Sequence, residues 1–222
     1  MIVFNCHHTN LIHPTHFSIF QETPYLVLPY CKLGSSELLI GNKLENENVW
    51  KYILDVSSGL AYLHALTPPI IHQDIKPDNI MVDNNGSYMI TDFGVSAHAK
   101  STLRKSMSIK FASAGTTAYM APERFSKDNT PIMANDIWSL GAMTYEMITG
   151  DNLFKAKDME ELKSEEKKGI YYLDLKLDLS TEIISFLNAM LQYEPDNRAS
   201  TDELLKHPFL NKNVKEFTDR KS

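Results

Sequence analysis

"IIHQDIKPDNIMV", residues 70–82, places a short polar segment between two apolar runs. The polar side chains are two carboxylates, a lysine and an amide: Asp74, Lys76, Asp78 and Asn79. Such residues also crowd into solvated turns, so an ordinary surface loop explains this stretch about equally well when it is taken alone. Position 73, directly before the first carboxylate, is Gln.

The composition is that of an ordinary globular protein. Of the 222 residues, 43% are hydrophobic and 23% are charged, which argues against disorder and allows one large domain or a small lobe with a larger one. The net charge is −6, and residues of both signs are interspersed. We therefore expect no nucleic-acid partner and no membrane-binding surface.

The cysteines and the N-terminus indicate the compartment. Cys6 and Cys31 are too few for a disulfide framework, which favours a reducing environment. The first residues lack the cationic start and apolar core of a secretory signal. The longest strongly apolar run, residues 137–148, is too short to cross a bilayer. We expect a cytoplasmic protein, with the nucleus as the alternative.

The first part of the chain predicts a β-hairpin followed by a helix. Residues 11–20 and YLVLPY at 25–30 are β-type runs, and QETP at 21–24 supplies a turn. From 45 to 64, apolar residues recur every three or four positions and should face the core: Val49, Ile53, Val56, Leu60 and Leu63.

A second hairpin is predicted at residues 79–93. NIMVD and SYMITDF flank Asn84, Asn85 and Gly86, and an Asn-Gly pair between such runs favours a hairpin because both residues tolerate positive φ. Residues 95–120 show no steady period and are interpreted as one long loop. A loop of that length is usually functional or disordered.

The remainder is predicted to be helical. Asn135 or Asp136 should cap a helix that starts at Ile137 and ends at Gly150. A charged helix is expected at 157–169, an amphipathic helix with a Ser cap at 180–191, and another helix at 200–210. The fold class is therefore α+β, a little β structure followed by a mainly helical body.

The polar cluster contains the groups that phosphoryl transfer requires. Transfer from ATP to a hydroxyl needs a carboxylate near the attacking oxygen, ligands for Mg²⁺, and a cation beside the moving phosphoryl group. Asp74, Asn79, Asp92 and Lys76 supply that set.

Five motifs in order make the hypothesis specific. His72, Asp74 and Asn79 match a catalytic-loop pattern, and DFG at 92–94, APE at 121–123, DIWSLG at 136–141 and DNRAS at 196–200 follow. With these motifs the chain resembles a eukaryotic-type protein kinase from about residue 8 to residue 210. The resemblance implies a mainly helical large lobe with a remnant of the β-rich small lobe.

The resemblance also implies the site residues and cofactors. Asp74 would be the catalytic base, Lys76 its cationic neighbour, and Asn79 and Asp92 the ligands of Mg²⁺ bound with ATP. Lys76, and Thr116 in GTTAYMAPE at 115–123, are typical of kinases that act on Ser and Thr of protein substrates.

YLVLPYCKLG at 25–34 resembles the kinase hinge. Leu28 corresponds to the gatekeeper, and the backbone C=O of Pro29 and N–H of Cys31 correspond to the adenine-binding pair. Proline is tolerable at 29 because it retains its carbonyl. Met81 would form the apolar floor of the adenine site. Without the other motifs, an edge strand and a core methionine would be the preferred interpretation.

Several other residues have competing interpretations. His72 is expected to be structural rather than an acid or base. Asp136 is either a helix cap or, as the resemblance implies, the residue that braces the catalytic-loop backbone. Glu123 and Arg198 are expected to form a buried ion pair. The N-terminal cysteine and histidines allow a zinc site, which is much weaker than a structural interpretation: Cys6, His7, His8, His13 and His16.

Gln73 departs from the kinase pattern, which usually has Arg before the catalytic Asp. Arg at that position pairs with a phosphorylated residue of the activation loop, and Gln cannot form that charge-assisted pair. We expect that phosphorylation at Ser106, Ser108 or Ser113 is not recognised through position 73.

The small-lobe motifs are a second departure. No glycine precedes Gly34, and Lys32 lies in the hinge, so the Gly-rich loop, the strand Lys and the helix Glu are expected upstream of Met1. The expected division is 1–30, small-lobe remnant and hinge entry; 31–210, large lobe; and 211–222, C-terminal tail. Without those parts, we expect the chain alone to have little activity. We also expect an exposed β edge and apolar surface where the missing strands would pack, and a regulatory protein that covers this surface.

Three functions remain in competition at this stage. The leading one is a Ser/Thr protein kinase seen as a truncated chain. The second is a non-catalytic kinase-like scaffold that binds other proteins, which the missing upstream motifs favour and the intact polar set opposes. The third, a small-molecule phosphotransferase, is weaker because GTTAYMAPE resembles a platform for peptide substrates.

Overall fold

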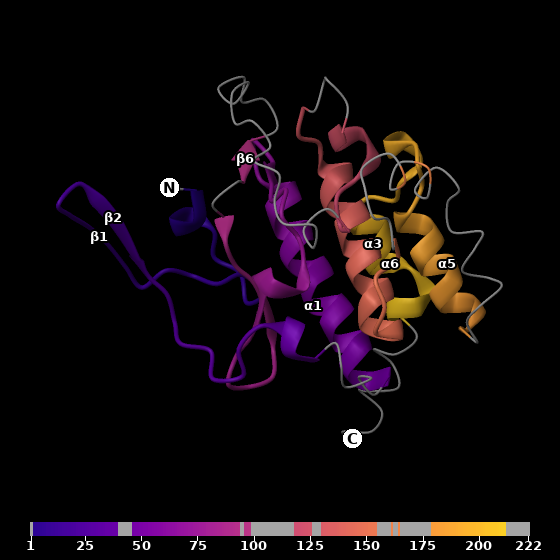
Figure 1. Ribbon diagram of the computed structural model, residues 1–222, viewed down its shortest axis with the longest axis horizontal. Helices are drawn as coiled ribbons and strands as arrows, with labels where there is room; N and C mark the ends of the chain where they lie inside the picture. Colours follow the sequence, from indigo (N-terminus) through magenta and orange to yellow (C-terminus); the bar gives the residue numbers. More distant parts are fainter. Residues whose placement is uncertain are drawn as a thin grey trace.

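The computed structural model describes residues 2–39, 46–93, 96–98, 118–125, 130–154, 161, 164 and 179–211. Its helices gather on one side, the short strands lie beside them, and one hairpin projects from the body (Figure 1). The helices are α1 (Asn46–Ala65), α3 (Met133–Thr149), α5 (Thr181–Met190) and α6 (Thr201–Lys206). The strands are β1 (His16–Phe20), β2 (Thr23–Val27), β3 (Ile70–Ile71), β4 (Ile80–Val82), β5 (Tyr88–Ile90) and β6 (Ala97–His98). The chain thus has the predicted α+β organisation, a little β structure with a mainly helical body.

Helix α1 lies at the centre of the core. It packs against α3, α6 and β5, and its predicted apolar stripe is buried along its whole length: Val49, Ile53, Val56, Leu60 and Leu63. Burying one such side chain contributes about 1.5–3 kcal/mol. The predicted helix at 45–64 is therefore confirmed to within one residue at each end.

The hairpin of β4 and β5 confirms the second predicted hairpin. Its strands pair antiparallel, with Ile80 opposite Ile90. Gly86 has a φ of 77°, and the Asp83 carboxylate accepts hydrogen bonds from the backbone N–H groups of Asn85 and Ser87. The loop therefore depends on an aspartate as well as on a glycine.

The first predicted hairpin is also present, but its boundaries differ. Residues 11–15 are not part of β1, because Leu11 bridges to Ile90 and the N–H of Ile12 donates to the Ile90 carbonyl at 2.9 Å. The turn consists of Gln21 and Glu22, both with positive φ, and the rest of QETP belongs to β2.

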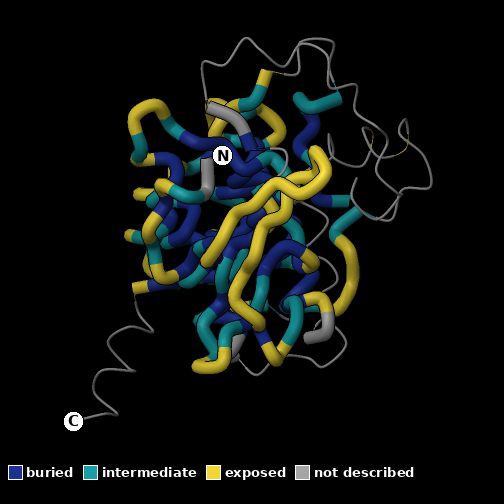
Figure 2. The backbone as a smooth tube through the Cα atoms, turned by 90° about the vertical axis from the view of Figure 1, so that its left-hand side faces the viewer, coloured by how far each residue is buried: buried dark blue, intermediate teal, exposed yellow. Residues whose placement is uncertain are grey.

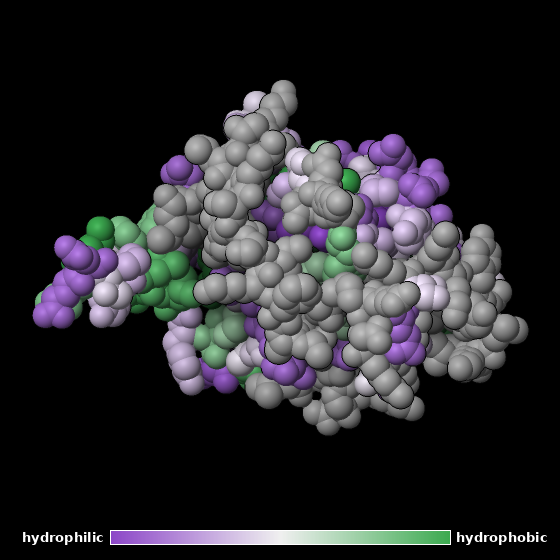
Figure 3. Space-filling model, turned by 45° about the horizontal axis from the view of Figure 1, so that its top comes forward, coloured by the Kyte–Doolittle hydropathy of each residue, from purple (hydrophilic) through white to green (hydrophobic). Residues whose placement is uncertain are grey.

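The hairpin of β1 and β2 stands away from the body, and all ten of its strand residues are exposed (Figure 2). Its tip is largely hydrophilic, and hydrophobic residues gather toward its base (Figure 3). The strand register places one wholly apolar set on a single face: Phe17, Ile19, Pro24 and Leu26. Ile19 is 66% exposed. An apolar face of this kind normally packs against another element.

The helix predicted from Ile137 begins earlier, at Met133. The Asn135 side chain accepts a hydrogen bond from the backbone N–H of Ile132 at 2.9 Å, so Asn135 stabilises the helix start from within the first turn. Gly150 ends the helix with a φ of 77°, as predicted. The Ser180 hydroxyl caps α5, also as predicted, by accepting from the N–H of Ile183.

The predicted loop at 95–120 is interrupted by β6, whose Ala97 and His98 pair with β3. Residues 99–117 lie outside the described residues, as does the predicted helix at 157–169 apart from Glu161 and Ser164. Among the helices that the structure describes, none combines the length and apolar character needed to cross a bilayer.

Candidate functional site

Residues 72–79 form a tight loop between β3 and β4, and Asn79 holds it closed. Asn79 lies in the 3-10 turn η3 (Pro77–Asn79), where Pro77 fixes φ at the turn start. Its buried Nδ2 donates to both the carbonyl oxygen and Oδ2 of Asp74, each at 2.8 Å. The bonds fix the carboxylate of Asp74 relative to its own backbone.

Lys76 completes the cluster. Its Nζ lies 3.2 Å from Asp74 Oδ2, the oxygen that also accepts from Asn79. Both side chains are partly exposed, so this pair adds little to stability. The arrangement places a cation beside a carboxylate whose position is already set, as transfer of a phosphoryl group requires.

Asp92 is brought to the same region by the backbone. The N–H of Thr91 donates to the Asn79 carbonyl at 2.9 Å, which ties the end of β5 to the loop at residues 72–79, one residue before Asp92. Asp92 is exposed and has a φ of 58°. Since the Asn79 amide donates through Nδ2 to Asp74, its Oδ1 is the atom suited to a metal. One amide oxygen and one carboxylate are hard ligands that fit Mg²⁺.

Asp136 braces the backbone before Asp74. Its Oδ2 accepts from the N–H of His72 and its Oδ1 from the N–H of Gln73, both at 2.8 Å. Burial raises the pKa of this carboxyl, but hydrogen bonding and charge from the histidines, led by His64, outweigh it and hold the pKa below its usual value. Asp136 therefore remains ionised, and of its two interpretations the brace, rather than the helix cap, is correct.

His72 packs inside the site rather than facing a substrate. Its Nε2 lies 2.9 Å from the Thr91 carbonyl, and its ring meets the Phe93 ring edge-on at a centroid distance of 5.1 Å. Burial lowers the pKa of His72, with Asp136 opposing the shift most strongly. A buried, neutral imidazole agrees with the structural role expected from the sequence.

The predicted hinge runs alongside β4. The N–H of Gly34 donates to the Cys31 carbonyl, and the Gly34 carbonyl accepts from the N–H of Val82 at 3.0 Å. A β-bridge between Ser35 and Met81 places this segment beside Met81, the residue predicted to form the apolar floor of the adenine site. Cys31 is buried, which raises the pKa of its thiol. Pro29 remains exposed.

Comparison with known proteins bears on this geometry. The family model of the protein kinase domain matches residues 1–210. The chain belongs to the protein kinase family.

The relatives of this chain include serine/threonine-protein kinases, Aurora kinases and a mitogen-activated protein kinase kinase. Mitogen-activated protein kinase kinase 3 of Arabidopsis thaliana is 38% identical over 166 residues, 72% of this chain and 30% of the relative. The Aurora kinase of Schizosaccharomyces pombe is 30% identical over 223 residues, 98% of this chain and 59% of the relative. Aurora kinase C of Mus musculus is 30% identical, covering 91% of this chain and 70% of the relative. The chain thus spans less than two thirds of the length of most of the relatives it matches.

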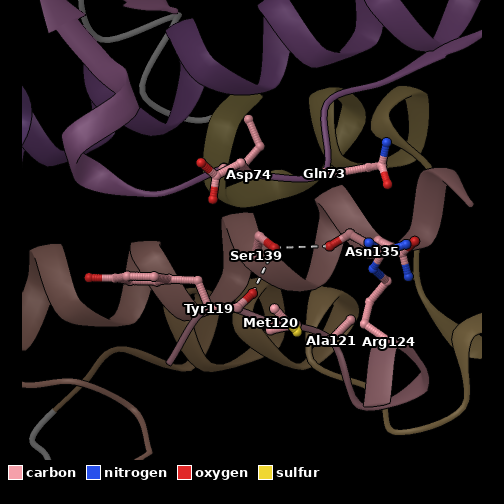
Figure 4. Close-up of a pocket in the computed structure, with 9 residues that line it drawn as sticks. Gln73, Asp74, Tyr119, Met120, Ala121, Arg124, Asn135 and Ser139 are labelled. Carbon is pink, nitrogen blue, oxygen red and sulfur yellow. Dashed lines mark hydrogen bonds between the residues drawn. The ribbon is translucent and has the colours of Figure 1, made fainter. Parts of the chain in front are cut away.

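A pocket in the kinase domain opens beside the catalytic loop. Gln73 and Asp74 line one side, and Ser139 and Asn135 of α3 lie in the middle (Figure 4). The other side is lined by Tyr119, Met120, Ala121 and Arg124. The Ser139 hydroxyl donates to the Tyr119 carbonyl at 2.7 Å. The side chains of Gln73 and Asp74 diverge, so residue 73 reaches a region of the pocket away from the candidate base.

The expected ion pair of Glu123 and Arg198 is confirmed. The guanidinium is buried and donates to both carboxylate oxygens, at 2.6 and 2.8 Å. It also donates to three backbone carbonyls, those of Ala134, Gln192 and Tyr193, and its centre lies 4.9 Å from the Trp138 ring. The pair joins η6 (Pro122–Phe125) to α3 and to the segment before α6.

Sequence reasoning missed His64, whose Nε2 lies 2.9 Å from Asp136 Oδ2. A signal existed, because His64 falls four residues after Leu60 on the apolar face of α1. It also missed Glu146, which accepts a hydrogen bond from the buried Tyr119 hydroxyl. Burial raises the pKa of Glu146, and the nearby Asp78 and Glu37 raise it further.

Two further predictions from the sequence concern the long loop and a zinc site. Thr116 and the three loop serines lie outside the described residues, so the structure does not bear on them. The zinc hypothesis receives no support, because the described residues contain no group of three or more His, Cys, Asp or Glu side chains placed to hold a metal.

Proposed function

We propose that this chain is the catalytic part of an ATP-dependent protein kinase that transfers the γ-phosphoryl group of ATP to Ser or Thr hydroxyls of protein substrates. The observation that carries the proposal is the Asn79 amide bridging the backbone and carboxylate of Asp74, with Lys76 at the same oxygen. An ordinary surface turn needs neither a buried amide nor a fixed carboxylate.

Each residue has a distinct task in this proposal. Asp74 orients the substrate hydroxyl and accepts its proton, and Lys76 offsets negative charge at the transferred group. Asn79 and Asp92 hold Mg²⁺, which when bound with ATP neutralises charge on the phosphates. The hinge groups of Pro29 and Cys31 bind adenine above Met81.

The Ser/Thr class is supported by Lys76 and by the names of the relatives. The serine/threonine-protein kinase TOS3 of Saccharomyces cerevisiae, whose name states this class, is 32% identical over 243 residues, and two Aurora kinases are also among the relatives. The division into a remnant at 1–30, a large lobe at 31–210 and a tail at 211–222 is part of the proposal, as is a cytoplasmic location, which cell fractionation would test.

The test is phosphoryl transfer from radiolabelled Mg·ATP to peptides that carry Ser, Thr or Tyr, comparing wild type with Asp74→Asn. Removing a positioned base should lower the transfer rate on the order of 10²- to 10⁴-fold. Asp78→Asn is the matched control, because Asp78 is an exposed carboxylate of the same loop. A measurable wild-type rate that Asp74→Asn leaves unchanged, or transfer to Tyr alone, would contradict the proposal.

The second candidate is a non-catalytic scaffold, which the exposed apolar face of the β1–β2 hairpin favours. The scaffold predicts no Mg·ATP binding and no transfer, whereas the kinase predicts both. In either case we propose a regulatory protein that covers this face. Such a protein should slow amide hydrogen exchange in residues 16–27, and unchanged exchange at a saturating concentration would exclude it.

A further inference from the structure

Ser36 carries a buried hydroxyl that joins the segment after the predicted hinge to the loop of the candidate site. The residue begins the 3-10 helix η2 (Ser36–Leu39) and is 0% exposed. Its Oγ lies 2.9 Å from the carbonyl oxygen of Pro77 in η3 and 3.3 Å from the hydroxyl of Tyr52 in α1. Three elements that are separate in the sequence therefore meet at one oxygen atom.

The directions of these two hydrogen bonds follow from the groups involved. A carbonyl oxygen can only accept, so the single hydrogen of the Ser36 hydroxyl is donated to Pro77. The Tyr52 hydroxyl must then donate to the Ser36 oxygen. Burial raises the pKa of Tyr52, so its hydroxyl keeps the hydrogen that it donates. A continuous chain of hydrogen bonds runs from Tyr52 through Ser36 to Pro77.

Pro77 is the first residue of the turn that carries Asn79. Proline has no N–H, so its carbonyl is the only backbone group through which hydrogen bonds can hold it. That carbonyl also accepts from the N–H of Ile80, which closes the turn. Two residues after Pro77, the Asn79 amide fixes the carboxylate of Asp74. A shift of the Pro77 carbonyl would therefore move the residue proposed to hold both the base and Mg²⁺.

The residues just before Ser36 belong to the segment proposed to bind adenine. The Gly34 carbonyl accepts from the N–H of Val82 at 3.0 Å, and a β-bridge pairs Ser35 with Met81. Backbone contacts therefore tie this segment to β4, whereas the hydroxyl of Ser36 ties it to η3. The hydroxyl thus lies between the proposed adenine site and the proposed metal site.

We propose that Ser36 is a positioning residue: its hydroxyl fixes the Pro77 carbonyl and thereby sets the place of Asn79 relative to the adenine-binding segment. Its consequence for the binding of Mg²⁺ with a nucleotide rests on the proposed kinase function. Its consequence for the turn, protection of the backbone amides of Asn79 and Ile80, does not.

The first experiment measures amide hydrogen exchange at Asn79 and Ile80 by NMR in the full chain. Ser36→Ala removes the hydroxyl with little change in volume, whereas Ser36→Thr keeps it. Exchange at both amides should accelerate about five- to tenfold in Ser36→Ala and stay near the wild-type rate in Ser36→Thr. Equal exchange in the wild type and Ser36→Ala, or equal acceleration in both variants, would overturn the proposal.

Ser57→Ala is the matched control, because Ser57 of α1 is also 0% exposed but its hydroxyl has no hydrogen-bond partner among the described residues. The control loses the same atom and should leave both amides unchanged, and an equal acceleration there would overturn the proposal. A further test needs no variant. In an equal mixture of H₂O and D₂O, a slowly exchanging Ser36 hydroxyl gives two Cβ signals, as we expect. One averaged signal would overturn the proposal even if Ser36→Ala fails to fold.

The binding arm compares adenosine with Mg·ADP by isothermal titration calorimetry. Adenosine needs the proposed hinge groups alone, whereas Mg·ADP also needs the proposed metal ligand Asn79. Ser36→Ala should therefore weaken Mg·ADP binding about five- to tenfold and leave adenosine binding unchanged. Unweakened Mg·ADP binding, or equal weakening of both ligands, would overturn the positioning role. If the wild type binds neither ligand, the kinase proposal fails, while the amide measurements still decide the role of Ser36.

Discussion

At the scale of single residues, the backbone and the side chain of Gln73 have different roles. Its backbone N–H is held by Asp136, a task that any residue can perform, whereas its side chain lines the pocket opposite the segment Tyr119–Arg124. A neutral amide at that place cannot form the charge-assisted pair that Arg forms with a phosphate.

This arrangement leads to a prediction about phosphorylation at Ser106, Ser108 or Ser113. Phosphatase treatment should leave the transfer rate of the wild type unchanged, because no guanidinium at position 73 recognises the phosphate. The measurement is the initial rate before and after treatment, with phosphate occupancy followed by mass spectrometry. Gln73→Arg is the comparison, since it restores the pairing group. A large loss of wild-type activity on dephosphorylation would reject the prediction.

Arg198 carries a prediction about stability. Arg198→Met leaves Glu123 without its buried partner and several carbonyls without a donor, so the free energy of unfolding should fall by about 3–5 kcal/mol. Urea denaturation followed by circular dichroism measures the change. Lys206→Met, an exposed cation on α6, should alter stability by less than about 0.5 kcal/mol. Similar losses in the two variants would argue against a structural ion pair.

At the scale of elements, α1 is held against the strands by a glycine. A Cβ on Gly59 would lie 2.9 Å from the Asn10 carbonyl oxygen and 3.0 Å from Ile90 Cδ1. The first contact is with backbone, which cannot move without disturbing the hydrogen bond that the same carbonyl accepts from the N–H of Ile90.

Gly59→Ala therefore sets two effects of opposite sign against each other. Helix propensity alone would stabilise the protein by about 1 kcal/mol. We expect a net loss of about 1–3 kcal/mol instead, because the methyl group overpacks a closed interface. Thermal or urea unfolding decides the sign, and Ser58→Ala, the adjacent and partly buried position, is the control. A higher stability of Gly59→Ala would show that the contact of α1 with Asn10 and Ile90 can adjust to the added methyl group.

The same elements show what sequence patterns can predict. The stripe of α1, the β4–β5 hairpin and the Ser180 cap were predictable, because each depends on residues only a few positions apart. The start of α3 was not, since Asn135 supports the backbone from inside the helix instead of preceding it. Leu11 and Ile12 were misassigned to the first hairpin because their backbone pairs with Ile90 of β5, nearly eighty residues away.

At the scale of the whole molecule, the site combines local and distant contacts. Asp74, Lys76 and Asn79 lie within six residues, so their grouping was readable from the sequence, and motif order suggested Asp92. The sequence left Asp136 with two interpretations, a helix cap or a brace of the loop backbone, and it did not predict the contact of Asp136 with His64. Such bonds depend on how α1, α3 and the catalytic loop pack, which no local pattern encodes.

Three histidines also link stability to pH. Burial lowers the pKa of His72, His8 and His207 below the ordinary value of 6.5. Below about pH 6.5 the unfolded chain binds protons that the folded chain does not. These histidines therefore do not lower the free energy of unfolding above about pH 6.5. They lower it as the pH falls from there toward their lowered pKa values. Glu146 has a raised pKa and acts with the opposite sign.

His72 is the fully buried member and should dominate the slope. Between about pH 6.5 and 5, the free energy of unfolding should fall by up to about 1.4 kcal/mol per pH unit for this group. His72→Gln should flatten the dependence, because its amide takes up no proton, while His16→Gln on the exposed strand β1 should not. Urea unfolding across this range measures both. A wild-type stability that rises on acidification, or an equal slope in His72→Gln, would mean that His72 is protonated inside the fold.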